Sequence, residues 1–219
     1  MNIANNWEWS SHQPLIRAVL AEFKPRYILE LGMGEYSTPI FIDYSPEFML
    51  SVENDVKWQM HIKKKYGTKY KSVLHQLESN LGSKSFVKDM TDTQKESIKN
   101  YYIDLGKSIE ETDIHPKLLF VDQFTCCRTI SINTLYPYFD IIIYHDCEPR
   151  GVVWYEYYFE EKLKTDFLHY TLKTPAVWTG CFLKNSLKDN NLNKTISPYI
   201  EKYCEENKLN KTTVKLVNE

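Results

Sequence analysis

A short apolar run that stops at a glycine turn constrains the fold of this chain more than any other feature. The run is Tyr27–Leu31, and Gly32 and Gly34 follow it directly. An apolar segment this short, without polar alternation, is typical of a strand buried on both faces of a parallel sheet. The Ser-Thr-Pro sequence at 37–39 then gives a helix-start signal. We therefore predict a strand, a tight turn and a helix in direct succession.

Apolar strands and helical patterns continue to alternate along the chain. We expect further strands at 48–52, 72–77, 117–122 and 140–146, and a closing hairpin from 168–172 and 176–183. Helices are expected before the first strand, at 55–66 and around 98–109, the last behind a capping box of Thr93 and Glu96. This alternation predicts an α/β fold: a Rossmann-like, doubly wound, mostly parallel seven-stranded sheet with helices on both faces and a C-terminal β-hairpin.

Length and linker composition indicate one domain. The 219 residues can build one sizeable core, and no internal repeat or Gly/Ser-rich linker interrupts them. We interpret 1–219 as a single domain with an N-terminal helical segment at 1–26. A core at 27–184 carries a helical insertion at about 78–116, and a C-terminal helix or tail occupies 185–219.

Charge and composition exclude several functional classes. Twenty-seven basic residues against twenty-nine acidic ones give a net charge of −2, which argues against a general nucleic-acid binder. No stretch approaches the roughly 18 apolar residues of a membrane span, and the first residues lack an apolar signal region. We expect a cytoplasmic protein with no membrane partner. The five cysteines contain no CxxC pair, which favours free thiols.

An acid stands where a nucleoside-binding turn needs one. Glu53 follows Gly34 by nineteen residues, at the end of the second expected strand. In Rossmann-type sites an acid near this spacing accepts hydrogen bonds from the ribose hydroxyls, and the glycines bring backbone N–H groups close to the ligand. Ser37 replaces the third glycine of a full dinucleotide fingerprint. A lone G-x-G is explained equally well by turn glycines, but strand, turn, helix and acid together favour a nucleoside-containing cofactor.

Acids also follow the later strands. Asp122 ends the expected strand at 117–122, and His145 and Asp146 end the expected strand at 140–146. In open α/β sheets, ligands bind at the carboxyl ends of the strands. We therefore expect Glu53, Asp122 and Asp146 to converge at one edge of the sheet.

These segments resemble class I S-adenosylmethionine-dependent methyltransferases. The resemblance rests on E-L-G-x-G-x-x-S-T at 30–38, S-V-E-N-D at 51–55 with Trp58, F-V-D at 120–122 with Arg128 behind it, and H-D-x-E at 145–148. It extends from about residue 11 to residue 183. It implies that S-adenosyl-L-methionine is the cofactor.

The resemblance also implies which residues bind this cofactor. Glu30 and the backbone at Gly32 and Gly34 would face its methionine part. Ser37 and Thr38 would hold its carboxylate. The full set of expected cofactor contacts is Glu30, Gly32, Gly34, Ser37, Thr38, Glu53, Asn54 and Asp122.

The elements at 121–128 and 145–148 are similar to the branch that contains small-molecule and sugar O-methyltransferases. We therefore expect O-methylation of a sugar or glycan hydroxyl, or of another small polar acceptor. His145 is the expected general base, with Asp146 and Asp122 setting its position and charge. The expected substrate contacts are His12, Arg128, Glu148, Trp154 and Tyr155.

Several members of that branch hold a divalent metal at these strand ends. The matching residues here are Asp122, His145 and Asp146, and oxygen-rich ligands of this kind suit Mg²⁺ or Mn²⁺. His145 stands where metal-dependent relatives have an acid. We therefore expect activity without a metal.

Two other functions compete with this one. A nicotinamide (NAD)-dependent oxidoreductase shares the fold and the Glu53 spacing, but Ser37 and the lack of a Tyr-x-x-x-Lys dyad count against it. A non-catalytic binding module of the same fold is the second alternative. The intact set of Glu30, the two glycines and Glu53 counts against that reading.

Overall fold

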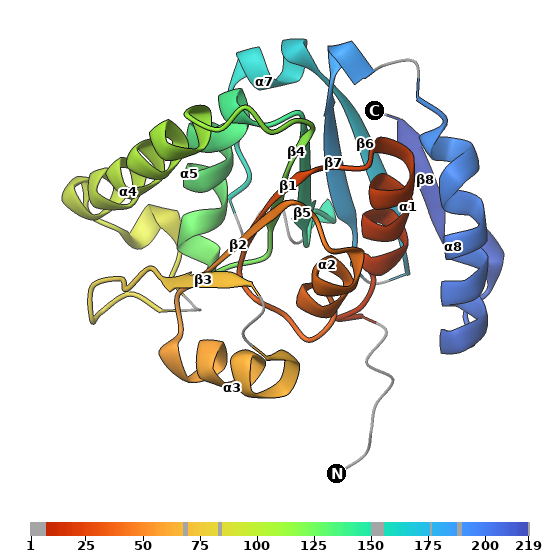
Figure 1. The fold of residues 1–219 in the computed structure, drawn as a ribbon, viewed down its shortest axis with the longest axis horizontal. Coiled ribbons are helices and arrows are strands. Elements are labelled where there is room, and N and C mark those ends of the chain that lie inside the picture. Colours follow the sequence, from red (N-terminus) through yellow and green to blue (C-terminus); the bar gives the residue numbers. More distant parts are fainter. Residues whose placement is uncertain are drawn as a thin grey trace.

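One twisted sheet forms the centre of the molecule (Figure 1). The computed structural model describes residues 8–67, 70–82, 85–149, 156–175, 177–187 and 190–218. Within these residues the sheet has eight strands in the order β3-β2-β1-β4-β5-β7-β6-β8. The strands are β1 (Tyr27–Leu31), β2 (Phe48–Glu53), β3 (Lys71–Leu74), β4 (Lys117–Val121), β5 (Ile141–His145), β6 (Phe167–Lys173), β7 (Thr179–Lys184) and β8 (Lys215–Asn218).

Strand directions divide the sheet into a parallel part and an antiparallel part. The strands β1 to β5 pair in parallel, β7 runs antiparallel to both β5 and β6, and β8 runs antiparallel to β6. All residues of β1, β4 and β5 are buried, as expected for central strands covered on both faces. The chain leaves β1 toward β2 on one side and reaches β4 on the other. The gap between β1 and β4 is therefore the topological switch point, where such sheets bind ligands.

Helices cover both faces and give each face its own core (Figure 1). On one face α4 (Asp92–Glu110) and α5 (Thr125–Leu135) pack together, with Tyr102, Ile109 and Ile132 fully buried. On the other, α1 (Gln13–Phe23) packs against α8 (Leu192–Asn207) and, with α2 (Thr38–Tyr44), covers the sheet. The helix α3 (Val56–Tyr66) follows β2, and the short α7 (Glu161–Asp166) precedes β6.

The fold class predicted from the sequence is confirmed, with three corrections of detail. The expected seven-stranded sheet has an eighth strand, β8, which lies at the edge of the sheet beside β6 and has no fully buried residue. A strand of four residues without a buried side chain leaves little pattern in the sequence. The third strand ends at Leu74 rather than at residue 77.

The capping box of α4 lies two residues earlier than predicted. Thr91 Oγ1 accepts from the N–H of Gln94 at 3.2 Å, and Gln94 Oε1 accepts from the N–H of Thr91 at 3.0 Å. The Thr93–Glu96 pair has the same spacing, but it lies inside the helix, where the backbone N–H groups already have intrahelical partners.

The five cysteines are all buried, and none of them forms a disulfide. None of the helices in the described ranges combines the length and the apolar character that a membrane crossing requires.

Packing of Tyr144 over Gly180 gives a test of the antiparallel part of the sheet. The two residues pair directly between β5 and β7, and a Cβ on Gly180 would lie 2.1 Å from the Tyr144 ring. The ring is held by a 2.7 Å hydrogen bond between its hydroxyl and His169. We expect Gly180→Ala to lower the free energy of unfolding by about 1–3 kcal/mol, measured by urea denaturation. Gly82→Ala, where an added Cβ meets nothing within 4 Å, should change it by less than about 0.5 kcal/mol. Equal effects of the two substitutions would contradict this packing.

Candidate active site

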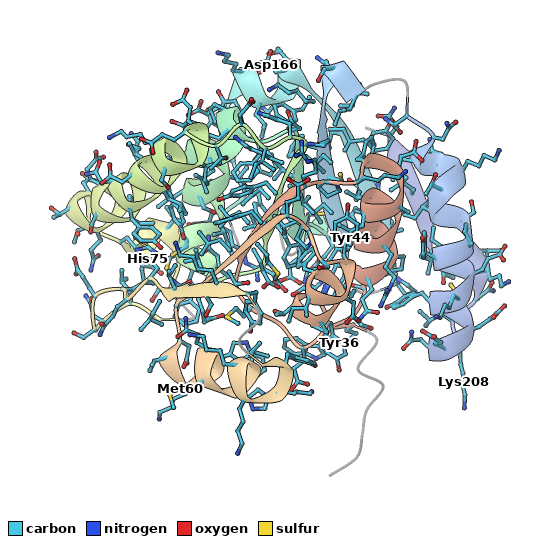
Figure 2. The ribbon with its side chains drawn as sticks, in the orientation of Figure 1. Tyr36, Tyr44, Met60, His75, Asp166 and Lys208 are labelled. Carbon is cyan, nitrogen blue, oxygen red and sulfur yellow. The ribbon has the colours of Figure 1, made fainter. Side chains whose placement is uncertain are left out.

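A cavity of about 670 Å³ opens at the carboxyl ends of β1, β2, β4 and β5. This is the edge at which the sequence predicts that the strand-end acids converge. Tyr36 and Trp58 are among the residues that line it. Figure 2 shows Tyr36 beside α2, and it shows Met60 on α3, the helix that also carries Trp58. The lining residues are Glu8, Trp9, His12, Gly32, Met33, Gly34, Glu35, Tyr36, Ser37, Glu53, Trp58, Asp122, Gln123, Phe124, Thr125, Arg128, His145, Asp146 and Val177.

Gly32 is required where β1 meets β4. Its φ is +88°, a backbone region that side chains other than glycine rarely adopt. A Cβ at this position would lie 2.3 Å from the carbonyl oxygen of Asp122. The backbone of the turn therefore touches the backbone at the end of β4. This contact brings the glycine turn and the acid of β4 to the same cavity.

Glu30 lies beneath the turn and does not line the cavity. Its carboxylate is fully buried and accepts hydrogen bonds from the hydroxyls of Ser37 (2.8 Å), Thr38 (2.9 and 3.1 Å) and Ser51 (2.7 Å). The Thr38 hydroxyl also accepts from the N–H of Gly34 at 2.9 Å. Glu30 thus ties the turn to the start of α2 and to β2. We assign it a positioning role rather than the ligand contact that the sequence predicts.

Burial raises the pKa of Glu30 to about 7, because desolvation outweighs the stabilising effect of its three hydroxyl donors. Ser37 borders the cavity and Thr38 does not. Both hydroxyls already donate to Glu30. A ligand carboxylate near the start of α2 would therefore meet backbone groups before these hydroxyls.

Glu53 faces the cavity from the end of β2. One of its oxygens accepts from the N–H of Met33 at 2.9 Å, and the other from Asn54 (2.7 Å) and Asp55 (2.9 Å). Burial raises the pKa of the Glu53 carboxyl despite these donors. A carboxylate offers about four acceptor positions, so roughly one remains for a ligand hydroxyl. The Asn54 side chain donates to the carbonyl of His75 instead and does not border the cavity.

Arg128 joins the two acids at the ends of β4 and β5. It donates to Asp122 at 2.7 Å, to Asp146 at 2.8 Å and to the carbonyl of His145 at 3.1 Å, and its side chain is only 7% exposed. Burial alone would raise the pKa of Asp122, but His145 and Arg128 hold it well below its usual range. The guanidinium is thus occupied by the protein's own carboxylates. We therefore replace the expected substrate contact with an organising role.

His145 is buried between a hydroxyl and two carboxylates. Its Nε2 lies 2.8 Å from Ser11 Oγ, and its Nδ1 lies 3.5 Å from an oxygen of Asp122 and 3.5 Å from one of Asp146. Burial lowers the pKa of His145, but Asp146 and Asp122 more than offset this, so the pKa lies above its ordinary value. Asp146 reaches this position with a φ of 60°, uncommon outside glycine.

His12 sits against His145 at the start of α1. Their rings meet edge to face with centroids 4.7 Å apart. Burial lowers the pKa of His12 to about 3, and His145 adds to the lowering. Neither ring nitrogen makes a hydrogen bond to the described residues, although the carbonyl of Tyr36 acts weakly on the ring. The site therefore contains a buried neutral imidazole with two unused nitrogens.

Of the remaining expected substrate contacts, only Glu148 lies in the described part of the chain. Glu148 accepts from the backbone N–H of Trp178 at 3.2 Å and does not line it. Trp154 and Tyr155 lie outside the described residues. Sequence reasoning missed Ser11 as the partner of His145 and Met33 as a donor to Glu53. The only sequence signal for them is their position, because Ser11 precedes His12 and Met33 lies between the two glycines of the turn.

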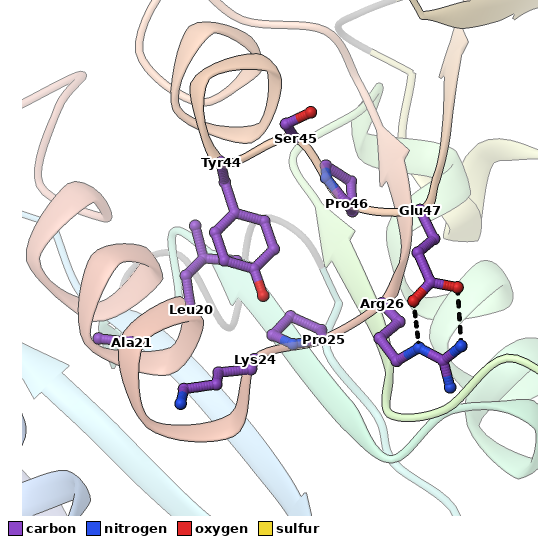
Figure 3. Close-up of a pocket in the computed structure, with 9 residues that line it drawn as sticks. All are labelled: Leu20, Ala21, Lys24, Pro25, Arg26, Tyr44, Ser45, Pro46 and Glu47. Atoms are coloured by element: carbon purple, nitrogen blue, oxygen red, sulfur yellow. Dashed lines mark hydrogen bonds and ion pairs between the residues drawn. The ribbon is translucent and has the colours of Figure 1, made fainter.

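A second cavity lies at the opposite end of the sheet and lacks comparable chemistry. It measures about 490 Å³, and it is lined by the end of α1, the end of α2 and the segments that enter β1 and β2 (Figure 3). Of its three charged lining residues, Lys24, Arg26 and Glu47, the last two pair with each other through two hydrogen bonds (Figure 3). We therefore place the candidate active site at the carboxyl ends of the strands.

Glu30 predicts a pH dependence of stability. Its folded pKa of about 7 exceeds the ordinary 4.5, so the folded protein retains this proton where the unfolded chain releases it. The resulting stability is complete below about pH 4.5 and is lost as the pH rises toward 7. Relative to Glu30→Gln, the wild type should lose up to about 3 kcal/mol of unfolding free energy across this window. Urea denaturation at several pH values measures this, and parallel curves for the two proteins would contradict it.

Comparison with known proteins leaves the function to be argued from this site. No family model and no curated protein matches the sequence. Among solved structures, the N-methyltransferase NodS from Bradyrhizobium japonicum WM9 is similar with a TM-score of 0.49 at 8% identity, covering 83% of this chain and 98% of that chain. The methyltransferase domain of bacterial CtHen1-CN gives 0.45 at 11% identity, covering 80% and 98%. An rRNA methylase from Streptococcus thermophilus gives 0.45 at 8% identity, covering 77% and 92%.

Proposed function

We propose that this protein is an S-adenosyl-L-methionine-dependent methyltransferase that acts on a hydroxyl of a small polar acceptor, most plausibly a sugar or glycan. One observation carries the proposal. The glycine turn and Glu53, which suit a nucleoside cofactor, open on the same cavity as His145 and its two carboxylates, which suit a proton transfer. Binding groups and reactive groups thus share one space of about 670 Å³.

The residues of the turn fit the cofactor. Gly32 and Gly34 both line the cavity, and a Cβ at either position would lie less than 3 Å from a neighbouring protein atom. Glu53 retains about one acceptor position for a ribose hydroxyl, and its three backbone donors keep it in place. When bound, the cofactor supplies an electrophilic methyl group on a sulfonium. Ser37 and the backbone at the start of α2 are the nearest groups for an amino-acid carboxylate.

The acceptor side of the cavity fits proton removal from a hydroxyl. A bound cofactor would supply the methyl group to the acceptor oxygen, and Nδ1 of His145 would take the proton that this hydroxyl loses. Asp122 and Asp146 stabilise the imidazolium that forms, because each has an oxygen 3.5 Å from this nitrogen. Ser11 holds Nε2 and therefore fixes the ring orientation. Arg128 keeps both carboxylates in position.

Cofactor binding is tested with Glu53. S-adenosylhomocysteine at about a hundredfold its dissociation constant should add about 2.7 kcal/mol to the unfolding free energy, measured by thermal unfolding. Glu53→Ala should remove most of this shift, because the ribose loses its acceptor. Glu148 does not line the cavity, so Glu148→Gln is the matched control. Its unfolding free energy should rise with S-adenosylhomocysteine as much as that of the wild type. NAD should give no shift. An unchanged melting curve with S-adenosylhomocysteine, or a larger shift with NAD, would reject the proposed cofactor.

The base is tested with His145. His145→Ala should lower turnover by about 10² to 10⁴, the usual contribution of a general base, with nearly unchanged cofactor affinity. The base must be neutral, and the pKa of His145 is raised. Wild-type turnover should therefore fall as the pH drops through a value above the ordinary 6.5. Methyl transfer to a panel of sugars from pH 5 to 9 measures both effects. A variant that keeps more than about a third of wild-type turnover would show that His145 is structural.

A further inference from the structure

Three side chains that line the cavity bring potential ligand atoms close together. His12 directly precedes α1, Asp122 follows β4, and His145 ends β5. Each offers one nitrogen or oxygen, and these three atoms all lie within 4.8 Å of one another. Among the described residues this is the one group of histidine, cysteine and acidic side chains that meets this condition. Asp146 does not join it.

Hydrogen bonding within the protein does not account for this arrangement. His12 is 2% exposed, and both of its ring nitrogens lack a hydrogen-bond partner among the described residues, which is costly for a buried polar group. The 3.5 Å separation of His145 Nδ1 from Asp122 Oδ2 exceeds an ordinary hydrogen bond. It matches the distance of about 3.4 Å between two ligands of a tetrahedral ion with bonds near 2.1 Å.

Charge in the cluster also favours a cation. Asp122 and Asp146 are both within reach of His145, and Arg128 is the guanidinium that bridges them. One guanidinium offsets one of the two buried carboxylates. A further positive charge beside Asp122 would balance the other.

We propose that His12, Asp122 and His145 bind one divalent transition-metal ion of the Zn²⁺ type. Two imidazoles and one carboxylate form the ligand set of catalytic zinc sites and of related iron sites, whereas Mg²⁺ prefers oxygen ligands and water. Three protein ligands leave an open coordination position, and it faces the cavity because all three residues line it. This position takes a water or an acceptor oxygen.

Ligand orientation supports the same assignment. A metal-bound histidine usually fixes its second nitrogen through a hydroxyl, carboxylate or carbonyl. Ser11 Oγ lies 2.8 Å from Nε2 of His145 and leaves Nδ1 for the ion. In the metal-bound protein Nδ1 of His145 is a ligand, so its role as a base belongs to the metal-free protein.

This site differs from the one the sequence suggests. The resemblance points to Asp122, His145 and Asp146 with Mg²⁺ or Mn²⁺, and His145 in place of an acid predicts activity without a metal. In the structure, His12 and not Asp146 belongs to the cluster with Asp122 and His145. A second imidazole ligand favours Zn²⁺ over Mg²⁺. The proposal does not rest on the proposed function, because the three ligands alone carry it.

Metal binding to the full chain, without cofactor, tests the site. After EDTA treatment and dialysis, calorimetry with Zn²⁺ and visible absorption with Co²⁺ should show about one bound ion per chain. His12→Ala and Asp122→Asn should each weaken binding by at least about tenfold. Asp146→Asn should change it by less than about threefold. His115→Ala removes an exposed histidine that pairs with Asp140 before β5, and it should bind as the wild type does. Mg²⁺ should give no binding heat at the same concentrations.

Several outcomes would overturn the site. They are substoichiometric binding, unchanged affinity in His12→Ala, or loss of binding in Asp146→Asn with His12→Ala unaffected. The last would return the ion to Asp122, His145 and Asp146. His12→Gln keeps most of the side-chain volume, and thermal unfolding without metal identifies any variant that fails to fold. The metal titration contains no cofactor, so a negative result does not affect the test of cofactor binding with Glu53→Ala.

Discussion

The close approach of β1 and β4 is the constraint on which the rest of the site depends. The two strands pair in parallel with Leu31 opposite Val121, so both chains leave the sheet at the same level. The N–H of Asp122 donates to the carbonyl of Leu31 at 2.8 Å, and Gly32 then passes so close to Asp122 that no side chain fits between them. A single backbone contact therefore fixes the distance between the half of the cavity that suits a cofactor and the half that suits proton transfer.

Four buried carboxylates surround this contact, and each is stabilised in a different way. Glu30 is solvated by hydroxyls, Glu53 by backbone N–H groups, and Asp122 and Asp146 by one guanidinium. Hydroxyls are the weakest of these partners for a charge, so desolvation prevails and raises the pKa of Glu30 to about 7. A guanidinium is the strongest, and with His145 it holds the pKa of Asp122 low. The hydrogen-bond and charge partners of each acid, and not its residue type, therefore decide whether its pKa is raised or lowered.

The arginine has a further consequence for the chemistry of the cavity. Because Arg128 is buried and donates to both acids, it fixes the side of each carboxylate that remains for His145. Such a preorganised arrangement needs little rearrangement when a substrate enters, which is how electrostatic catalysis gains most of its effect. The neighbouring His12 adds a neutral ring with unused nitrogens, so the same pocket combines fixed negative charge with uncommitted nitrogen ligands.

The sequence by itself determined the local elements and the edge at which they meet. Apolar runs such as Ile141–His145 predict buried strands, and the glycine turn with Glu53 nineteen residues later predicts a ligand site, because these signals depend on neighbours along the chain.

Tertiary structure alone decided the partners of each side chain. Ser11 and His145 are 134 residues apart, and nothing in the spacing of their sequence predicts that they form a hydrogen bond. Glu30, which the sequence predicts at a ligand, accepts hydrogen bonds from three hydroxyls. Arg128 pairs with two acids because α5, which carries it, begins directly after the end of β4. Contacts of this kind arise from the packing of helices on a sheet, which no local pattern records.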